Sequence, residues 1–173
     1  MFIRIGAAIA AICLFAGSGF AQGAKPTDPQ IAHIAYTAGQ IDIQAAQLAL
    51  KKSKNKDVQA FATDMVRDHK AVNDKALALV KKLKVKPEDN PTSQQLSKQA
   101  SDKRAELSKL NGAAFDKAYI DNEVAYHKTV NDALQNTLIP SASNQELKDL
   151  LTTGLKIFQG HEQHAEHVAA DFK

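Results

Sequence analysis

Apolar residues recur along this chain at spacings of three and four, and this pattern limits the possible folds more than any other feature. Residues three and four apart lie on the same face of an α-helix, whereas a half-buried strand needs strict alternation, which is missing from the pattern. Proline and glycine interrupt the pattern at only a few points. The sequence therefore predicts an all-α protein built from amphipathic helices.

The interruptions divide the chain into five predicted helical segments. Asp28 and Pro29 are a typical helix start, because aspartate caps free N–H groups and proline suits the first turn. Pro87 and Pro91 separate the second and third segments, and Pro140 is expected to end the fourth. The predicted ranges are 28 to 52, 55 to 84, 93 to 110, 113 to 139 and 144 to the C-terminus.

The third segment is short and mostly polar, which indicates a connector rather than a core helix. Short loops join the first segment to the second and the fourth to the fifth, so each pair should form an antiparallel hairpin. At 1.5 Å per residue the connector spans roughly 27 Å, enough to return the chain along the other helices. The second and fourth segments would then run parallel, as in a ferritin-like four-helix bundle with a crossover helix.

The N-terminus is typical of an exported protein. Arg4 precedes an uncharged run from Ile5 to Phe20, and Gly19 and Ala21 are small residues of the kind that a signal peptidase recognises. An uncleaved anchor is the alternative, but a spanning helix needs roughly 20 apolar residues. The mature protein is therefore expected to be periplasmic or secreted. The predicted parts are a signal peptide (1–21), a disordered segment (22–27) and a single helical bundle domain (28–173).

Composition argues against several classes of function. The single cysteine, Cys13, lies in the predicted signal peptide, so the mature chain has no cysteine for disulfides, thiolate metal sites or nucleophilic catalysis. The 22 Lys and Arg and 19 Asp and Glu form no basic tract, so no nucleic-acid partner is expected. After Phe20 no segment is apolar enough for a membrane anchor. A phosphate-binding glycine loop and an activated serine are also missing, which makes an enzyme the less favoured class.

Three histidines interrupt the apolar stripes of the predicted long helices, and they are the main candidates for chemistry. His69 lies in the second segment, His127 in the fourth and His161 in the fifth. If the second and fourth segments are parallel, His69 and His127 fall at a similar depth and His161 about one turn away. Ala38 and Gly39 of the first segment would leave room beside them.

Three neutral imidazoles with an open fourth position are a common zinc, copper or iron site, so a divalent transition metal is the expected cofactor if the rings converge. Asp68 and Glu123 lie close to His69 and His127 in sequence and are candidates for orienting the rings. Because the ligands must be neutral, binding should weaken as the pH falls through about 6.5. The alternative is a structural polar layer, in which hydrogen-bonded imidazoles fix the helix register.

The last segment carries two further histidines, His164 and His167, which the helical spacing directs toward solvent. Such a pair can hold a metal ion weakly, and a solvated polar face is the simpler interpretation. His33 lies off the apolar stripe of the first segment and is expected to be exposed.

Several short motifs resemble one known family. They read Phe61-Ala62-x-x-Met65-Val66-x-Asp68-His69, Phe115-Asp116-x-x-Tyr119 followed by His127, and His161-x-x-x-Ala165. Together they resemble the exported bacterial proteins of the domain of unknown function 4142 family, often labelled membrane or outer-membrane proteins, from about Asp28 to Val168. The resemblance implies a ferritin-like helical bundle, export to the periplasm and no established activity. The family's histidine positions map onto His69, His127 and His161, whereas His164 and His167 lie outside its pattern.

These features predict a periplasmic helical-bundle protein that binds a metal ion or small ligand at a core histidine layer. A structural or protein-interaction module connected with stress, without a ligand, is the alternative. A ferritin-like oxidoreductase comes third, because the Glu-x-x-His motifs of diiron bundles are missing from the sequence.

Overall fold

The computed structural model describes residues 25–172, and this part of the chain forms helices without any strand. The prediction of an all-α protein is therefore confirmed over these residues. The predicted signal peptide, residues 1–21, and positions 22–24 of the following segment lie outside the described residues. The helices are α1 (Asp28–Lys52), α2 (Lys56–Lys82), α3 (Pro91–Ser108), α4 (Gly112–Ala133), η1 (Leu134–Leu138), α5 (Ile139–Ser141) and α6 (Gln145–Ala170).

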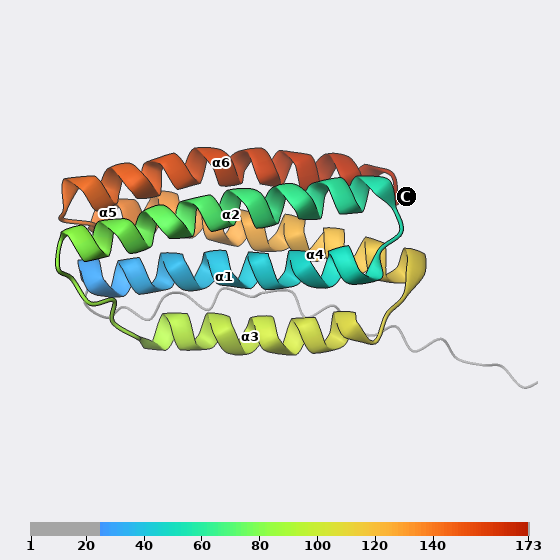
Figure 1. Ribbon diagram of the computed structural model, residues 1–173, viewed down its shortest axis with the longest axis horizontal. Helices are drawn as coiled ribbons and strands as arrows, with labels where there is room; N and C mark the ends of the chain where they lie inside the picture. The colour runs from blue at the N-terminus through green and yellow to red at the C-terminus, as the bar shows by residue number, and fades with distance from the viewer. Residues whose placement is uncertain (1–24, 173) are drawn as a thin grey trace, which may run out of the picture.

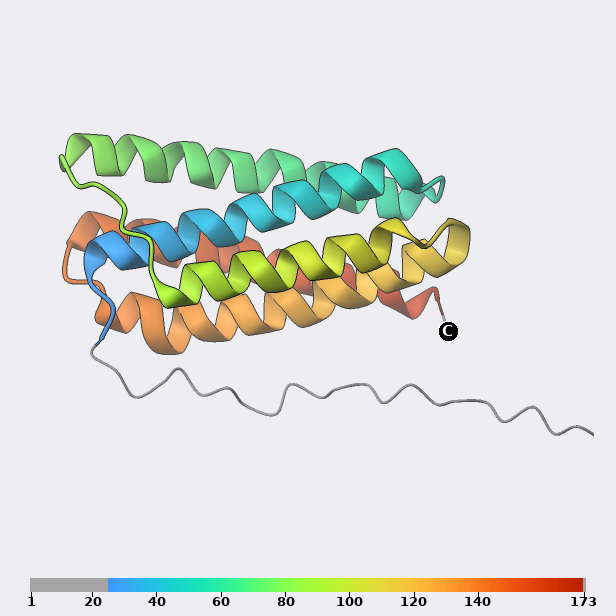
Figure 2. The same cartoon turned by 90° about the horizontal axis from the view of Figure 1, so that it is seen from below.

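Four long helices, α1, α2, α4 and α6, lie side by side, and α3 lies outside them against α1 and α4 (Figures 1 and 2). α1 packs along α2, α4 packs along α6, and α2 also contacts α6. In Figure 1, α1, α3 and α6 run from left to right, whereas α2 and α4 run from right to left. α3 thus carries the chain back along the length of the molecule, and α2 and α4 point in the same direction.

Asparagine caps determine where three of the helices begin. The side chains of Asn55, Asn90 and Asn144 accept hydrogen bonds from backbone N–H groups in the first turns of α2, α3 and α6. Such a cap contributes about 1 kcal/mol, because these N–H groups have no partner within the helix. Pro29 and Pro91 lie in the first turns of α1 and α3, where a missing N–H costs nothing.

The prediction that Pro140 ends the fourth helix is wrong. α4 continues into the π-helix η1, and α5 runs through Pro140 to Ser141. At the end of η1 the N–H of Ile139 donates to the carbonyl of Leu134, five residues earlier. The wider turn makes room for the proline ring, which in a regular α-helix would clash with the carbonyl four residues before it. The helix therefore includes Pro140 and ends one residue after it, at Ser141.

The buried core consists of two apolar clusters, one toward each end of the long helices. One is built around Phe61, Met65, Phe115 and Tyr119, near the loop between α1 and α2. The other includes Ile31, Leu134, Leu151 and Phe158, toward the opposite end. Each long helix contributes to both clusters, because its buried face is apolar along most of its length.

A layer of buried polar side chains separates the two clusters, and we refer to it as the polar layer. All four long helices contribute to it between their two apolar stretches. Buried polar groups cost free energy unless they are paired, so such a layer at the centre of the molecule needs an explanation. Its members are Asp42, His69, Asn73, Glu123, His127, Asn131 and His161.

Hydrogen bonds to Asp28 connect the start of α1 to the loop before α6. Its carboxylate accepts hydrogen bonds of 2.7 to 2.8 Å from the N–H and hydroxyl of Ser143 and the N–H of Asn144. Hydrogen bonds to charged groups contribute about 1.5–3 kcal/mol to stability. Because Asp28 is partly exposed, we expect its three hydrogen bonds to contribute an amount near the lower end of this range. We expect Asp28→Ala to lower the free energy of unfolding by about 2 kcal/mol in a denaturant titration. Asp57→Ala, which removes an exposed first-turn carboxylate of α2, should lower it by less than about 1 kcal/mol.

Candidate metal centre

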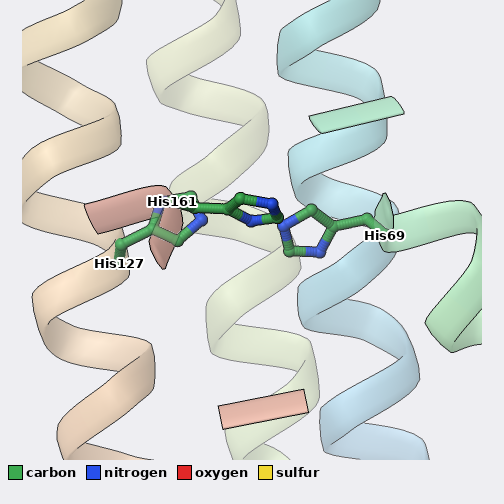
Figure 3. A group of neighbouring side chains, drawn as sticks. All are labelled: His69, His127 and His161. Atoms are coloured by element: carbon green, nitrogen blue, oxygen red, sulfur yellow. The ribbon is translucent and has the colours of Figure 1, made fainter. Parts of the chain in front are cut away.

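Three imidazole rings converge in the polar layer. His69 from α2, His127 from α4 and His161 from α6 point toward one another (Figure 3). The ring centroids are 5.7 Å apart for His69 and His127, 5.2 Å for His69 and His161, and 5.6 Å for His127 and His161. The structure therefore brings together the three histidines that the sequence singled out, and His161 lies at the level of the others rather than one turn away.

Burial and packing hold the three rings in place. The exposed fractions are 1% for His69, 1% for His127 and 6% for His161. The ring of His69 stacks on Phe158 of α6 with a centroid separation of 4.5 Å and an interplanar angle of 5°. This contact between α2 and α6 brings His161, one turn after Phe158, to the level of His69.

The outer nitrogens of two rings have oxygen partners. Nδ1 of His127 donates to the backbone carbonyl of Glu123 at 2.9 Å, and Nε2 of His161 donates to Oδ2 of Asp68 at 3.0 Å. Nε2 of His69 lies 3.5 Å from Oδ2 of Asp42, beyond a good hydrogen bond. Partners of this kind fix the tautomer and direction of metal-binding histidines.

Four ring nitrogens have no hydrogen-bond partner within the described part of the chain: both nitrogens of His69, Nε2 of His127 and Nδ1 of His161. One ligand atom from each ring lies within 4.8 Å of those of the other two. A point equidistant from three atoms 4.8 Å apart is about 2.8 Å from each, whereas zinc–nitrogen bonds measure about 2.0–2.1 Å. A shift of at most about 0.7 Å by each ring would therefore bring all three to bonding distance.

The environment keeps the three imidazoles neutral. Burial lowers the pKa of His127 to about 4 and that of His69 well below its usual range, with the neighbouring imidazoles adding to the effect for His69. Burial also lowers the pKa of His161, although its hydrogen bond to Asp68 opposes the shift. A neutral imidazole has the free lone pair that a metal ion requires.

Asp68 hydrogen-bonds to His161 rather than to His69, its neighbour in sequence. Successive residues of an α-helix point about 100° apart, so Asp68 cannot face the same neighbours as His69. Arg67 holds the Asp68 carboxylate through bonds of 2.7 and 2.9 Å and is the main cause that lowers the pKa of Asp68 to about 2. Asp68 therefore remains a carboxylate that accepts the His161 N–H.

Glu123 orients His127 through its backbone carbonyl, and its carboxyl group lies 3.7 Å from Nδ1 of the same ring and next to that of Asp42. Both carboxyl groups are buried, with exposed fractions of 1% for Glu123 and 2% for Asp42. Burial raises the pKa of Glu123 to about 8, and burial together with the Glu123 charge raises the pKa of Asp42 well above its usual range. Asp42, Glu123 and His127 form a second group whose ligand atoms lie within 4.8 Å of one another.

Asp42 was not among the site residues predicted from the sequence, although the spacing of its buried neighbours on α1 indicates that it is buried. Ala38, Asp42, Ala45 and Ala49 are spaced by four, three and four, and all four are buried. α1 buries a wide face on which Ile41 and Asp42 are neighbours in sequence and both buried. A charged residue at a position that continues a second apolar stripe is the pattern that would have revealed it.

Small residues of α1 do not leave the expected empty space. A Cβ atom on Gly39 would come within 2.5 Å of Oδ1 of Asn73, so the Asn73 side chain already fills the space beside that glycine. Asn73 in turn donates to the backbone carbonyl of Tyr36 at 3.4 Å. The polar layer is thus closed on this side by an asparagine.

The remaining histidines lie away from the three converging rings. His33 is half-buried rather than exposed, with 29% of its side chain accessible, because α3 and its preceding loop cover α1 and bring Asp89 to 3.8 Å. On α6, His167 is exposed, and the half-buried His164 packs edge-on against Phe61 at 5.2 Å. The nearest carboxylate oxygen to His164 belongs to Asp64 at 4.0 Å, so the His164 and His167 surface pair remains a prediction.

No helix within residues 25–172 combines the length and apolar character needed to cross a lipid bilayer. No curated protein matches the chain. A crystal structure from Streptomyces coelicolor, described as a secreted DUF305 protein, is similar with a TM-score of 0.71 and 9% identity, over 83% of this chain and 91% of that chain. At this identity the likeness shows a common fold. The family described as "Domain of unknown function (DUF4142)" matches residues 16–168, which is most of the sequence, and the protein therefore belongs to the DUF4142 family.

Proposed function

We propose that this protein is an exported helical bundle that binds one divalent transition metal ion at His69, His127 and His161. Zinc, copper and iron are the candidates, because neutral imidazole suits all three. We further propose that α1, α2, α4 and α6 form a ferritin-like four-helix bundle with α3 as its crossover helix. The parallel direction of α2 and α4 supports this connectivity (Figure 1).

The convergence of three unpaired nitrogens carries the metal-binding proposal. His127 and His161 donate their outer N–H to oxygen atoms, so their inner nitrogens are acceptors that face one another and His69. Each buried acceptor without a donor costs about 1–3 kcal/mol. A water molecule could donate to these two acceptors, whereas a metal ion would bind both of them together with a lone pair of His69, whose tautomer is not fixed by a hydrogen bond.

Export is the second part of the proposal. The charged start, the apolar run to Phe20 and the small residues Gly19 and Ala21 support a signal peptide over residues 1–21. The mature chain would begin at Gln22 and reside in the periplasm or outside the cell. Because it has no cysteine, the histidines are its best ligands for borderline metal ions.

Zinc should raise the melting temperature of the metal-free mature protein, and His127→Ala should abolish the rise. A ligand at 100 times its Kd adds about 2.7 kcal/mol of stability, which for a domain of this size corresponds to about 5–10 °C. The measurement is thermal unfolding of untagged protein with and without zinc, since an affinity tag would itself bind metal. Equilibrium dialysis followed by elemental analysis should give one zinc per chain.

Two control variants separate the core site from other histidines. His33→Ala and the double variant His164→Ala/His167→Ala should keep the full zinc-dependent rise. If His127→Ala lowers the melting temperature equally with and without zinc, the polar layer has a structural role only and the metal-binding proposal fails. If the rise disappears only in the double variant, zinc binds at the surface of α6 and the core proposal fails.

A further inference from the structure

The polar layer contains a second set of donor atoms that the three-histidine position does not use. Asp42 and Glu123 are almost fully buried, and their carboxyl groups hydrogen-bond to each other when one of them is protonated. When both are ionised, Oδ1 of Asp42 and both carboxyl oxygens of Glu123 have no donor among the described residues. Together with His127 they form a group whose ligand atoms lie within 4.8 Å of one another. Buried oxygens without a donor are rare in native proteins and point to a missing partner.

The donor types of the two groups differ. The three-histidine group offers three neutral nitrogens and brings no negative charge. The group of Asp42, Glu123 and His127 offers one nitrogen and two carboxyl groups. Imidazole suits zinc and copper, and carboxylate oxygen suits harder ions such as Mn²⁺. Two carboxylates would also neutralise the charge of a divalent ion, which is important where almost no water can reach.

We propose that Asp42, Glu123 and His127 form a second cation position, suited to Mn²⁺, that shares His127 with the three-histidine position and cannot be filled at the same time. This inference extends the proposed function by adding a second class of ion at the same centre. Asp42 also lies 3.5 Å from Nε2 of His69, so the two positions adjoin each other.

Two features make the positions exclusive. Nδ1 of His127 donates to the Glu123 carbonyl, which leaves this ring a single free lone pair, on Nε2, for one ion at a time. Two divalent ions a few ångströms apart would also repel each other strongly in a medium of low dielectric constant. Binding of the harder ion should therefore exclude zinc, and zinc should exclude the harder ion.

Two single variants test the second position separately from the first. Mn²⁺ binding to untagged mature protein can be followed by loss of the electron paramagnetic resonance signal of free Mn²⁺, and zinc binding by equilibrium dialysis. Glu123→Gln keeps the size of the side chain and the backbone carbonyl that orients His127. It should weaken Mn²⁺ binding by at least about tenfold and change the zinc Kd by less than about threefold. His161→Ala removes a ligand of the three-histidine position alone. It should weaken zinc binding by at least about tenfold and change the Mn²⁺ Kd by less than about threefold.

The outcomes distinguish this inference from the proposed function. If wild-type protein binds no Mn²⁺ up to millimolar concentration, or binds it equally well after Glu123→Gln, the second position is overturned while zinc binding can persist. Simultaneous binding of one zinc and one Mn²⁺ would overturn the shared use of His127. If Mn²⁺ binds and depends on Glu123 but zinc does not bind, the second position is supported and the three-histidine function fails.

Discussion

Replacing Glu123 with glutamine should raise the melting temperature of the metal-free protein at pH 8, and the gain should shrink as the pH falls toward 4.5. Burial raises the pKa of Glu123 to about 8 in the folded chain, against 4.5 for an ordinary glutamate. Between these values the folded chain holds a proton that the unfolded chain has released. The carboxyl group therefore costs stability as the pH rises through this window, and glutamine, which does not titrate, removes that cost.

The expected gain at pH 8 is at least roughly 5 °C, because each pKa unit corresponds to about 1.4 kcal/mol and each kcal/mol to about 2–4 °C for a domain of this size. The measurement is thermal unfolding of wild type and variant in the presence of a chelator, at half-unit steps between pH 4.5 and 8.5. Glu106→Gln on the exposed surface of α3 is the control and should shift the melting temperature by about 1 °C or less. Parallel pH profiles for wild type and Glu123→Gln would contradict the assignment of a raised pKa.

Zinc-dependent stabilisation should persist down to about pH 5. Burial lowers the pKa of His127 to about 4 and that of His69 well below the ordinary value of 6.5. A proton competes with the metal ion only when the pH approaches the pKa of the folded protein, so the imidazoles stay available for binding through the range in which an exposed histidine becomes charged. The predicted range thus extends below the pH of about 6.5 that unperturbed histidines would give.

In the metal-free protein the histidines should lower the stability over the same range. Because the histidine pKa values are lower in the folded chain than in the unfolded chain, the unfolded chain takes up protons first, and this contribution falls as the pH drops from about 6.5 toward 4. Glu123 contributes in the opposite direction, so the histidine contribution is measured in the Glu123→Gln variant. Thermal unfolding at pH 5 and pH 7, with and without zinc, measures both effects. A zinc increment that is full at pH 7 and absent at pH 5 would indicate exposed ligands such as His164 and His167, and would contradict binding in the polar layer.

Periodicity was sufficient to predict the helices and the common level of His69 and His127, because the rise of an α-helix per residue is fixed. Counting residues from the turns placed His69 and His127 at a similar depth, and the rings lie 5.7 Å apart between centroids. The same counting placed His161 one turn off, whereas its ring centroid lies 5.2 Å from that of His69, and Phe158 of the same helix stacks on His69. Tertiary packing of this kind is not contained in the pattern of a single helix.

Partners between helices were harder to predict than positions along them. Asp68 precedes His69 in sequence and yet binds His161, because the two side chains leave α2 in different directions. Asp42 was overlooked because α1 buries a face wider than one stripe. The raised pKa of Glu123 and the lowered pKa of His127 arise from burial, which a sequence pattern indicates only indirectly.

The near-complete burial of the three rings has a consequence for kinetics. An ion cannot reach or leave the polar layer while the long helices stay in place, since at most 6% of any of the three histidines is accessible. Exchange would depend on local opening of the helices, whose rate is set by their packing and not by the amount of free metal. The residence time of a bound ion would therefore be long even at moderate affinity. A chain that folded around an ion after export would retain it for as long as the fold itself stays closed.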